Sequence, residues 1–474
     1  MQSCYLAVDI GASSGRHILG FVRDGRMELK EIYRFENRLI RKDGHLCWEI
    51  DHLAAEVVNG LKACHEAGYA PVSMGIDTWA VDFVLLDKDG SRIGDAVAYR
   101  DERTDTMRQT LQDEGVLSFE TLYGKTGIQY QKFNTIYQLS ALKREHPEQL
   151  AAADCMLMIP DYLGWLLTGK KACEYTNAST TALVGADSRT WDEDLIARLG
   201  LPRNIFLPIS PAGTLLGSFR PEIAAEVGFD CTVILPATHD TGSAFLAVPA
   251  RDDNAAYLSS GTWSLLGVEN PAAITTEASA AANFTNEGGY QYRYRYLKNI
   301  MGLWMIQSIR REEGEKTGTR PSFPELIAAA QSESGFTACV DADDPRFLAP
   351  DSMQQAVKDA CAAAGQPVPA NLGQIMQCVY NSLADDYRRA ILQLQSLTGK
   401  TYTSINIVGG GSQDMYLNQR TANATGLPVF AGPTEGTALG NLIVQFIAGG
   451  EYADLQAARD AIKNSFTIKE VQPQ

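Results

Sequence analysis

Apolar residues cluster in short runs over the first 35 residues of the chain, and turn residues separate the runs. The runs cover residues 5–10, 17–22 and 27–35, with a Gly/Ser segment after the first and Asp24-Gly25 after the second. Short runs joined by tight turns are typical of neighbouring antiparallel strands. We therefore expect the chain to open with an antiparallel meander.

The period of the apolar positions then changes from that of strands to that of a helix. Leu53, Val57 and Leu61 recur at a spacing of four residues, which places them on one helical face. Asp51 precedes them and is a suitable N-cap residue. Residues 72–86 return to a strand-like composition. This succession predicts a mixed α/β layer.

The second half of the chain begins in a similar way. Residues 255–260 are a strand-like run, Gly261-Thr262 is a turn, and residues 263–268 run back. The likeness to the first hairpin predicts two related α/β lobes. We place their boundary at residue 247, which gives an N-terminal lobe of residues 1–247 and a C-terminal lobe of residues 248–474.

A long helix and a glycine-rich turn are expected within the second lobe. Ile375, Val379 and Leu383 begin a series at a spacing of four residues, which predicts an amphipathic helix that ends near Gly399. Residues 404–408 predict a strand that leads into three consecutive glycines. Such glycines permit the close approach of a flat ring or a phosphate, although a plain turn is the alternative.

Composition and charge narrow the class of protein. The chain has 474 residues, with 41 Lys and Arg against 57 Asp and Glu, for a net charge of −16. This balance argues against a broad nucleic-acid surface. The nine cysteines contain no C-x-x-C pair, and a chain of this length needs no disulfide scaffold, so we expect reduced thiols and a cytoplasmic location. We also expect no signal peptide and no membrane span.

The first segment that can carry chemistry is the turn after residues 5–10. Asp9 ends the apolar run, and the sequence Gly-Ala-Ser-Ser-Gly-Arg follows at residues 11–16. Glycines let backbone N–H groups approach phosphate oxygens closely, and serines add donors. The Asp9 carboxylate can hold a hydrated Mg²⁺. An ordinary Gly/Ser turn is the alternative.

The second segment is the sequence Thr-His-Asp-Thr-Gly at residues 238–242, which follows an apolar strand. A carboxylate at the end of a strand, as Asp240 is, suits a general base at the mouth of a cleft. Phosphoryl transfer needs a residue of this kind to orient the attacking hydroxyl. The alternative is a capping Asp240 before a helix that starts near Gly242.

The third segment places two carboxylates around an aromatic residue. Asp77 and Asp82 flank Trp79, an arrangement that can grip sugar hydroxyls and stack on a sugar face. A strand with alternate polar residues is the alternative. A further polar run at residues 175–181 is typical of a loop, and it suggests no mechanism.

Taken together, these segments resemble those of the FGGY carbohydrate kinases. The resemblance rests on segments that occur in order across nearly the whole chain: DIGASSGR, DTWAVDF, PDY, EYTNAST, THDTGSA, SSGTWS, KNIMGLW and VGGGSQ. It implies an α/β fold of two ribonuclease-H-like, actin-like lobes, with the active site in the cleft between them. The N-terminal lobe would bind sugar and phosphate, and the C-terminal lobe the nucleotide.

The resemblance also implies residue roles, with Asp240 as the catalytic base. Sugar contacts are implied for Ala80, His239, Thr241 and Asn299, to which the carboxylate pattern adds Asp82. ATP contacts are implied for Ala12, Ser13, Ser14, Gly15, Arg16, Thr262, Gln307 and Gly410. Ala80 stands where the family commonly has Gly, so its methyl group bears on fine substrate preference.

The implied activity is ATP- and Mg²⁺-dependent phosphorylation of a small ketose, with L-rhamnulose, phosphorylated at its C1 hydroxyl, as the implied sugar. L-Fuculose or a pentulose is the neighbouring alternative. An alternative from another class is a non-catalytic actin-like ATPase module. We expect neither a nucleic-acid nor a membrane partner, and the sequence leaves the oligomeric state open.

Overall fold

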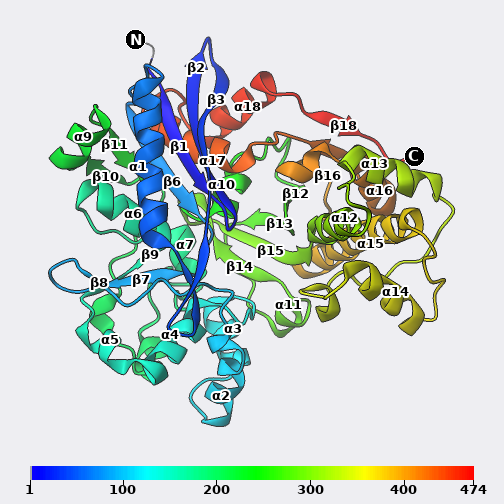
Figure 1. The fold of residues 1–474 in the computed structure, drawn as a ribbon, viewed down its shortest axis with the longest axis horizontal. Coiled ribbons are helices and arrows are strands. Elements are labelled where there is room, and N and C mark those ends of the chain that lie inside the picture. Colours follow the sequence, from blue (N-terminus) through cyan, green and yellow to red (C-terminus); the bar gives the residue numbers. More distant parts are fainter. Residues whose placement is uncertain (1–2) are drawn as a thin grey trace. The chain divides into compact units, whose positions relative to one another are not determined.

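The structure, a computed structural model, describes residues 3–474, and its contacts divide them into two units (Figure 1). The first unit takes in the described residues up to Ala247, together with Glu269–Tyr296 and Gly436–Ser465. The second consists of Val248–Val268, Leu297–Glu435 and Phe466–Gln474. Two segments from the expected lobe of residues 248–474, Glu269–Tyr296 and Gly436–Ser465, thus pack with the first unit.

A six-stranded mixed sheet is the centre of the first unit, in the order β10-β11-β6-β1-β2-β3. Strands β1, β2 and β3 form the predicted antiparallel meander, whereas β6 and β11 continue the sheet in parallel with β1. The bounds are β1 Tyr5–Ile10, β2 Ser14–Arg23, β3 Arg26–Glu36, β6 Ser73–Thr78, β10 Leu215–Ser218 and β11 Thr232–Ile234.

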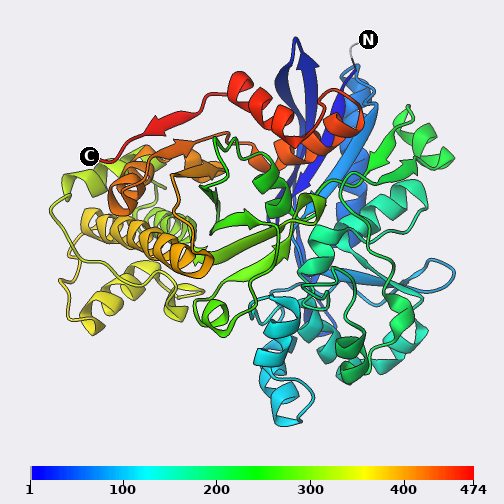
Figure 2. The ribbon, with the colours of Figure 1, turned by 180° about the vertical axis from the view of Figure 1, so that it is seen from behind.

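Helices cover both faces of this sheet (Figures 1 and 2). Helix α1 (Ile50–Glu66) lies on one face, and α10 (Asp240–Leu246) and α17 (Gly436–Ala448) lie on the other. Side chains alternate along a strand, so β1 points its apolar residues at α1. They form one buried core with the predicted helical face: Leu6, Val8, Ile10, Leu53, Val57 and Leu61. The N-cap of α1 is Glu49, so Asp51 lies in the first turn instead.

Helix α17 is fastened to the sheet by buried amide side chains. Gln445 donates to the Leu6 carbonyl oxygen at 2.9 Å and accepts from the Ser73 hydroxyl at 2.7 Å. Asn441 donates to the Asp77 carboxylate at 2.6 Å. These bonds satisfy polar groups away from water, where an unpaired group is costly. They explain why a helix from the end of the chain belongs to the first unit.

The strand expected over residues 72–86 is two strands in two sheets. β6 ends at Thr78, and β7 (Phe83–Leu86) joins a three-stranded sheet with β8 (Arg92–Ile93) and β9 (Cys155–Met158). The left-handed backbone of Val81, with φ of 68°, breaks the run between them. The break leaves residues 79–82 as a turn at the carboxyl end of β6.

The remaining elements of the first unit surround these sheets. The strands are β4 Leu39–Lys42, β5 His45–Trp48 and β14 Thr285–Gly288. The helices are α2 Met107–Asp113, α3 Phe119–Thr126, α4 Thr135–Glu145, α5 Pro147–Ala152, α6 Ile159–Thr168, α7 Tyr175–Ser179, α8 Glu193–Leu199, α9 Pro221–Val227, α11 Glu277–Ala281 and α18 Leu455–Ser465.

The second unit repeats the strand order of the first. Its order β15-β13-β12-β16-β17 corresponds to β3-β2-β1-β6-β11, with a hairpin followed by two parallel strands, and β18 adds to the edge. This repetition confirms the prediction of two related α/β lobes. The strands are β12 Ala255–Ser260, β13 Trp263–Asn270, β15 Tyr294–Met301, β16 Ser404–Val408, β17 Val429–Ala431 and β18 Lys469–Val471. The last residues of β13, 269–270, and the first residues of β15, 294–296, belong to the first unit.

Five helices accompany the sheet of the second unit. They are α12 Trp304–Thr317, α13 Phe323–Ser332, α14 Met353–Ala363, α15 Leu372–Thr398 and α16 Met415–Thr425. α15 is the predicted long helix, and it ends at Gly399 in the left-handed conformation. The glycine-rich turn follows β16 as predicted and leads into α16.

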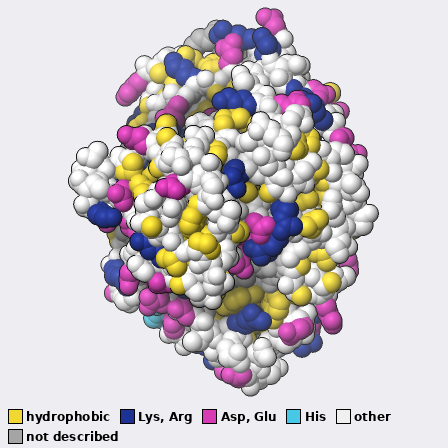
Figure 3. All heavy atoms as spheres, turned by 90° about the vertical axis from the view of Figure 1, so that its right-hand side faces the viewer, with side chains coloured by type: hydrophobic (Ala, Val, Ile, Leu, Met, Phe, Trp, Pro, Cys, Tyr) yellow, Lys and Arg dark blue, Asp and Glu magenta, His cyan; other side chains and the backbone are white. Residues whose placement is uncertain are grey.

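Surface and thiol features complete the description. On the face in Figure 3, Lys and Arg side chains are interspersed with Asp and Glu. All nine cysteines are free thiols, and all but Cys339 are buried. Within residues 3–474, no helix is both long enough and apolar enough to cross a membrane.

Gly440 allows the close contact between α17 and α10. A Cβ atom at this position would lie 1.7 Å from the Ser243 carbonyl oxygen. We expect Gly440→Ala to lower the free energy of unfolding by about 1–3 kcal/mol, because backbone atoms must move apart. Urea unfolding measures this change. The control is Gly124→Ala in α3, where a Cβ meets nothing within 4 Å. The control should be neutral or slightly stabilising, and an equal loss in both variants would contradict the packing argument.

Candidate functional site

Carboxylates from separate parts of the sequence meet at one edge of the first unit's sheet. Asp9 and Asp77 are register partners near the carboxyl ends of the parallel strands β1 and β6. The next residue of β6, Thr78, forms a parallel bridge with His239, which directly precedes Asp240. The strand ends therefore bring together three of the segments that the sequence singled out. Ligands commonly bind at this edge of α/β sheets.

The proximity of these carboxylates changes their proton affinity. Burial, followed by the negative charge of Asp9, raises the pKa of Asp240 to about 7. The same two causes raise the pKa of Asp77, which is fully buried, well above its ordinary value. Asp9 itself accepts a hydrogen bond from the Arg16 guanidinium at 2.6 Å. The three carboxylates thus lie close enough for the charge of Asp9 to oppose the ionisation of Asp77 and Asp240.

This concentration of charge suits a divalent cation. Mg²⁺ usually takes only one or two carboxylates from a protein and completes its coordination with water and phosphate oxygens. Among the described residues, no group of three or more His, Cys, Asp or Glu side chains could hold a metal by itself. A single carboxylate ligand is all that the metal-binding role predicted for Asp9 requires.

The two carboxylate oxygens of Asp240 are unlike. Oδ1 accepts from the Thr241 backbone N–H at 2.5 Å and from its hydroxyl at 3.1 Å, and the Nε2 atom of His239 lies 3.4 Å away. Oδ2 has no bonded partner within the described chain, and the side chain is 31% exposed. Oδ2 is therefore the oxygen that is open to accept a proton. Helix α10 begins at Asp240, two residues earlier than the capping alternative placed its start.

His239 is held by a buried ion pair that the sequence motifs did not include. The Nη2 atom of Arg295 lies 3.0 Å from both the Nδ1 atom of His239 and the Oε2 atom of Glu287. Burial, followed by the charge of Arg295, lowers the pKa of His239 well below its ordinary value. Arg295 is 1% exposed and stands in a strand otherwise rich in tyrosine and aliphatic residues. A cation inside a buried strand was the one signal that could have identified it.

Asp82 supports the wall of the site from behind. Its carboxylate accepts from Trp48 Nε1 at 2.6 Å, Trp79 Nε1 at 2.9 Å, Gln138 Nε2 at 2.9 Å and the Tyr99 backbone at 3.0 Å. Only 1% of its surface is exposed. Its hydrogen-bonding capacity is taken up within the protein, so it fixes the two indole rings. This corrects the expectation that Asp82 contacts sugar hydroxyls.

The turn that carries Ala80 is rigid. The rings of Trp48 and Trp79 lie 4.1 Å apart between centroids, and the Asp82 N–H donates to the Ala80 carbonyl oxygen at 2.9 Å. Ala80 itself is half-buried, so its methyl group lies in a fixed position next to this turn. A fixed methyl group can discriminate between ligands of similar shape, as its predicted role requires.

The residues predicted to face phosphate lie in the turn between β1 and β2 and at the start of β2. Ser13 is exposed, and Ala12, Ser14 and Arg16 are half-buried. Gly15 is buried, and a Cβ atom there would lie 2.1 Å from the Phe35 ring. Packing against Phe35 therefore requires a glycine at position 15, independently of the phosphate contact predicted for its backbone N–H.

The polar run at residues 175–181 is not the loop that the sequence predicted. It contains the buried helix α7, which Glu174 caps. Oε2 of Glu174 accepts from the N–H and hydroxyl of Thr176 at 2.9 and 2.5 Å, and from the N–H and hydroxyl of Thr238 at 3.1 and 2.8 Å. The Thr176 hydroxyl also accepts from the His239 N–H at 3.2 Å. The run is polar because it bonds to the segment that carries Asp240.

Helix α7 also holds the strand that carries Glu287. The Ser179 hydroxyl accepts from the Gly288 N–H at 2.8 Å. The Tyr175 ring fills the space beside Gly288, where a Cβ atom would lie 2.6 Å from the ring. One short helix therefore fixes both sides of His239, the segment that contains it and the strand β14 beside it.

The second unit contains the other predicted ligand contacts. Thr262 lies in the β12–β13 turn, and its carbonyl oxygen accepts from the Trp304 N–H at 3.1 Å at the start of α12, the helix of Gln307. The glycine turn that includes Gly410 packs on the end of β12, where a Cβ at Gly411 would lie 1.9 Å from the Ser260 hydroxyl. The elements of Thr262, Gln307 and Gly410 therefore meet around one turn. Asn299 is half-buried on β15.

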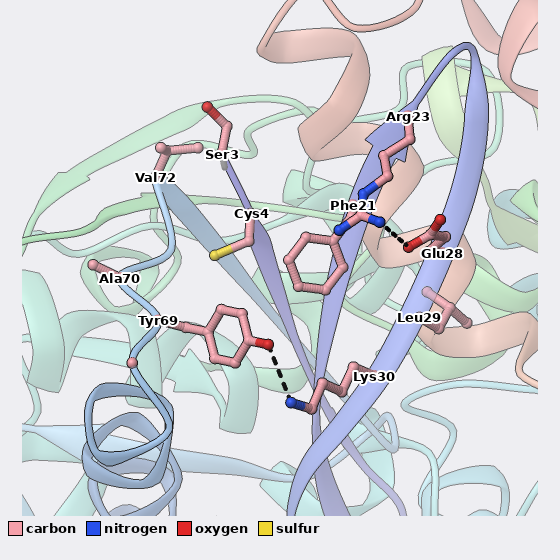
Figure 4. A pocket seen from close by; sticks show the side chains of 11 residues that line it. Ser3, Cys4, Phe21, Arg23, Glu28, Leu29, Lys30, Tyr69, Ala70 and Val72 are labelled. Atoms are coloured by element: carbon pink, nitrogen blue, oxygen red, sulfur yellow. Dashed lines mark hydrogen bonds and ion pairs between the residues drawn. The ribbon is translucent and has the colours of Figure 1, made fainter. Parts of the chain in front are cut away.

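A separate cavity of about 540 Å³ lies at the opposite end of β1 (Figure 4). It is lined by Ser3, Cys4, Phe21, Arg23, Glu28, Leu29, Lys30, Gly68, Tyr69, Ala70 and Val72. At about 3.3 Å per residue, the strand separates Cys4 from Asp9 by roughly 16 Å. Arg23 pairs with Glu28, and Lys30 contacts Tyr69. None of the predicted ligand contacts lines this cavity.

Comparison with protein families gives two matches. The N-terminal domain of the FGGY family of carbohydrate kinases matches residues 4–247, and the C-terminal domain of that family matches residues 256–449. A rhamnulokinase from Oceanobacillus iheyensis is 50% identical over 468 residues, which cover 99% of this chain and 98% of the relative. A rhamnulokinase from Bacteroides thetaiotaomicron is 43% identical, and the match covers 100% of this chain and 96% of the relative.

Solved structures show the same fold at low sequence identity. A ligand-bound xylulose kinase from Lactobacillus acidophilus has a TM-score of 0.81 at 17% identity and covers 100% of this chain and 94% of that chain. Plasmodium falciparum glycerol kinase with ADP has a TM-score of 0.79 at 14% identity, and the match covers 100% of this chain and 95% of that chain. These likenesses confirm the predicted fold class.

The hydrogen bonds that one Glu174 oxygen accepts from Thr176 and Thr238 give a stability prediction. We expect Glu174→Ala to lower the free energy of unfolding by about 2–4 kcal/mol, because it leaves buried donors unpaired. Glu174→Gln retains an acceptor oxygen and should cost less. Urea unfolding of both variants gives the comparison. The control is Glu193→Ala, an exposed partner of Arg203, with an expected change within about 0.5 kcal/mol. If Glu174→Ala is as stable as Glu193→Ala, the hydrogen bonds to Glu174 do not stabilise the fold.

The charge cluster gives a second prediction, about the pKa of Asp240. Asp9 is the nearest negative charge that raises this pKa, so we expect Asp9→Asn to lower it from about 7 toward the ordinary range of aspartate. Carboxyl-carbon NMR of the full chain without divalent cations measures the titration. Asp89→Asn, an exposed change in a turn, should leave the pKa where it is. An unchanged pKa in Asp9→Asn would show that burial alone sets it.

Proposed function

Because this chain belongs to the FGGY family of carbohydrate kinases, we propose that it transfers the γ-phosphate of ATP to the C1 hydroxyl of L-rhamnulose. The observation that carries the chemistry is the asymmetry of the Asp240 carboxylate, with Oδ1 bonded by Thr241 and Oδ2 open. The support for the sugar is that relatives named rhamnulokinase match nearly the whole chain at 42–50% identity.

In the proposed reaction, Oδ2 of Asp240 accepts the proton of the C1 hydroxyl while that oxygen attacks the γ-phosphorus of ATP. The bond between the γ-phosphorus and the β–γ bridging oxygen breaks, and ADP leaves with the electron pair. A base is most effective when its pKa is close to the working pH, and the pKa of Asp240 is about 7. Ala80, His239, Thr241 and Asn299 are the proposed sugar contacts.

ATP is proposed to bind through two sets of residues. Backbone and side-chain donors of residues 12–16 would contact its phosphates, and Thr262, Gln307 and Gly410 would contact the nucleotide. Mg²⁺ held at Asp9 would neutralise charge that develops on the phosphate oxygens. With these roles, the first unit would bind phosphate and most of the sugar, and the second unit would bind the nucleotide and contribute Asn299 to the sugar. We further propose that the enzyme acts in the cytoplasm, where ATP is available.

The substrate assignment is tested by ADP release with MgATP and a panel of ketoses against a blank without sugar. We expect L-rhamnulose to give the largest kcat/KM. A larger value for L-fuculose or a pentulose would keep the mechanism and change the substrate. Stimulation by none of the sugars, together with sugar-independent ATP hydrolysis, would favour the actin-like ATPase alternative.

The role of Asp240 is tested by Asp240→Asn. We expect turnover to fall by about 10²–10⁴-fold, because the amide cannot accept the proton, while KM for ATP changes little. For the unaltered enzyme, kcat/KM should fall tenfold per pH unit below about 7, since protonation removes the base. Asp113→Asn, an exposed change, is the control. Turnover within a few-fold of the unaltered enzyme would remove Asp240 from this role.

A further inference from the structure

The buried pair of Glu287 and Arg295 has no part in the proton transfer itself. Both residues lie on the hairpin of β14 and β15, and their surfaces are 9% and 1% exposed. The turn between the strands holds Gln291 and Tyr292 with left-handed φ angles of 54° and 59°. Buried ion pairs contribute little net stability once desolvation is counted, so stability alone does not account for this one.

The guanidinium of Arg295 is fixed on several sides. Its Nε–H donates to the Gly288 carbonyl oxygen at 3.0 Å, and its Nη2 donates to His239 Nδ1 and pairs with Glu287, each at 3.0 Å. The Phe245 ring of α10 lies 5.9 Å from its central carbon atom. A planar cation held in this way keeps one orientation, so its Nη2 atom keeps facing His239 and Glu287.

These contacts decide where the proton of His239 resides. An arginine side chain only donates and stays protonated in proteins. The Nδ1 atom of His239 must therefore be the acceptor, and the neutral ring then carries its proton on Nε2. Nε2 lies 3.4 Å from Oδ1 of Asp240, the oxygen that Thr241 already bonds.

We infer that Arg295 is a positioning residue, which keeps His239 in the Nε2–H form so that this N–H faces Oδ1 of Asp240 and Oδ2 remains the proton acceptor. The role rests on the proposed function. Arg295 touches neither the sugar nor ATP in this assignment and acts through His239. Glu287 holds the guanidinium in place from the opposite strand.

The charges around His239 make the arrangement depend on Arg295. The groups that face the ring are Arg295 on β15, Glu287 on β14 and Asp240 on α10. Glu287 Oε2 is 3.4 Å from Nδ1. Without the guanidinium, this carboxylate would be the nearest partner of Nδ1 and would draw a proton to it. The ring would then be a cation or the opposite tautomer.

Nitrogen NMR of the full-length enzyme with labelled histidine side chains tests the inference without substrate. His239→Gln assigns the resonances among the six histidines. We expect Nδ1 of His239 to be unprotonated and Nε2 protonated from pH 6 to 8, and Nδ1 to gain a proton in Arg295→Met. A protonated Nδ1 in the unaltered enzyme would overturn the inference, even if the Met variant does not fold. So would an unprotonated Nδ1 in a folded Arg295→Met.

Arg459→Met is the matched control. Arg459 is also a buried arginine of the first unit that pairs with a glutamate, Glu269, and it bonds carbonyl oxygens at the far end of α10. It should lower stability without moving the proton of His239. A shifted proton in this control would mean that general loosening, and not Arg295, changes the tautomer.

Kinetics separate positioning from packing. In Arg295→Met we expect kcat to fall roughly 10- to 100-fold, the scale on which groups behind a reacting residue act, while KM for ATP changes less than about threefold. In a His239→Gln background, Arg295→Met should lower kcat by less than about threefold, because glutamine has no tautomer for Arg295 to select. An equal loss in both backgrounds would overturn the inference. The NMR result needs no sugar, so it stands apart from the substrate assignment.

Discussion

The Glu174 carboxylate accepts hydrogen bonds from two chain segments at once, and the geometry of the site depends on this convergence. Burial raises its pKa, whereas the donors of Thr176 and Thr238 oppose that effect. The carboxylate thus joins the start of α7 to the residues that precede α10. Through Ser179, the same helix is bonded to β14. Asp240, the neighbouring His239 and the ion pair behind His239 are therefore anchored to one short helix.

Around this anchor, burial and charge give similar side chains different tasks. Asp82 and Asp240 are both aspartates, but Asp82 is surrounded by donors and fixes aromatic rings, whereas Asp240 keeps one oxygen open. The charge of Asp9 raises the proton affinity of Asp240, while the neutral state of His239 keeps a second cation away from it. The division of roles follows from how many donors each carboxylate meets.

Local patterns predicted the parts of the fold that depend on near neighbours. The meander, the second hairpin and helix α15 follow from apolar spacing and turn residues, and the structure has them. The patterns failed where distant contacts override local preference. Val81 breaks an apparently continuous strand, and the polar run of α7 is buried because its donors and acceptors meet partners far along the chain. Glu287 and Arg295 belong to no motif, and it is the folded hairpin that identifies them as a pair.

The return of α17 to the first unit has a consequence for how the chain is made. Gln445 bonds to Leu6 across 439 positions, so one face of the earliest strand obtains its cover from nearly the last part of the sequence. During synthesis, β1 and β6 leave the ribosome long before this helix exists, and two of the three segments of the second unit, Val248–Val268 and Leu297–Glu435, are translated in between. The first unit therefore cannot complete its core as an autonomous N-terminal domain, because that core closes only after α17 has been translated.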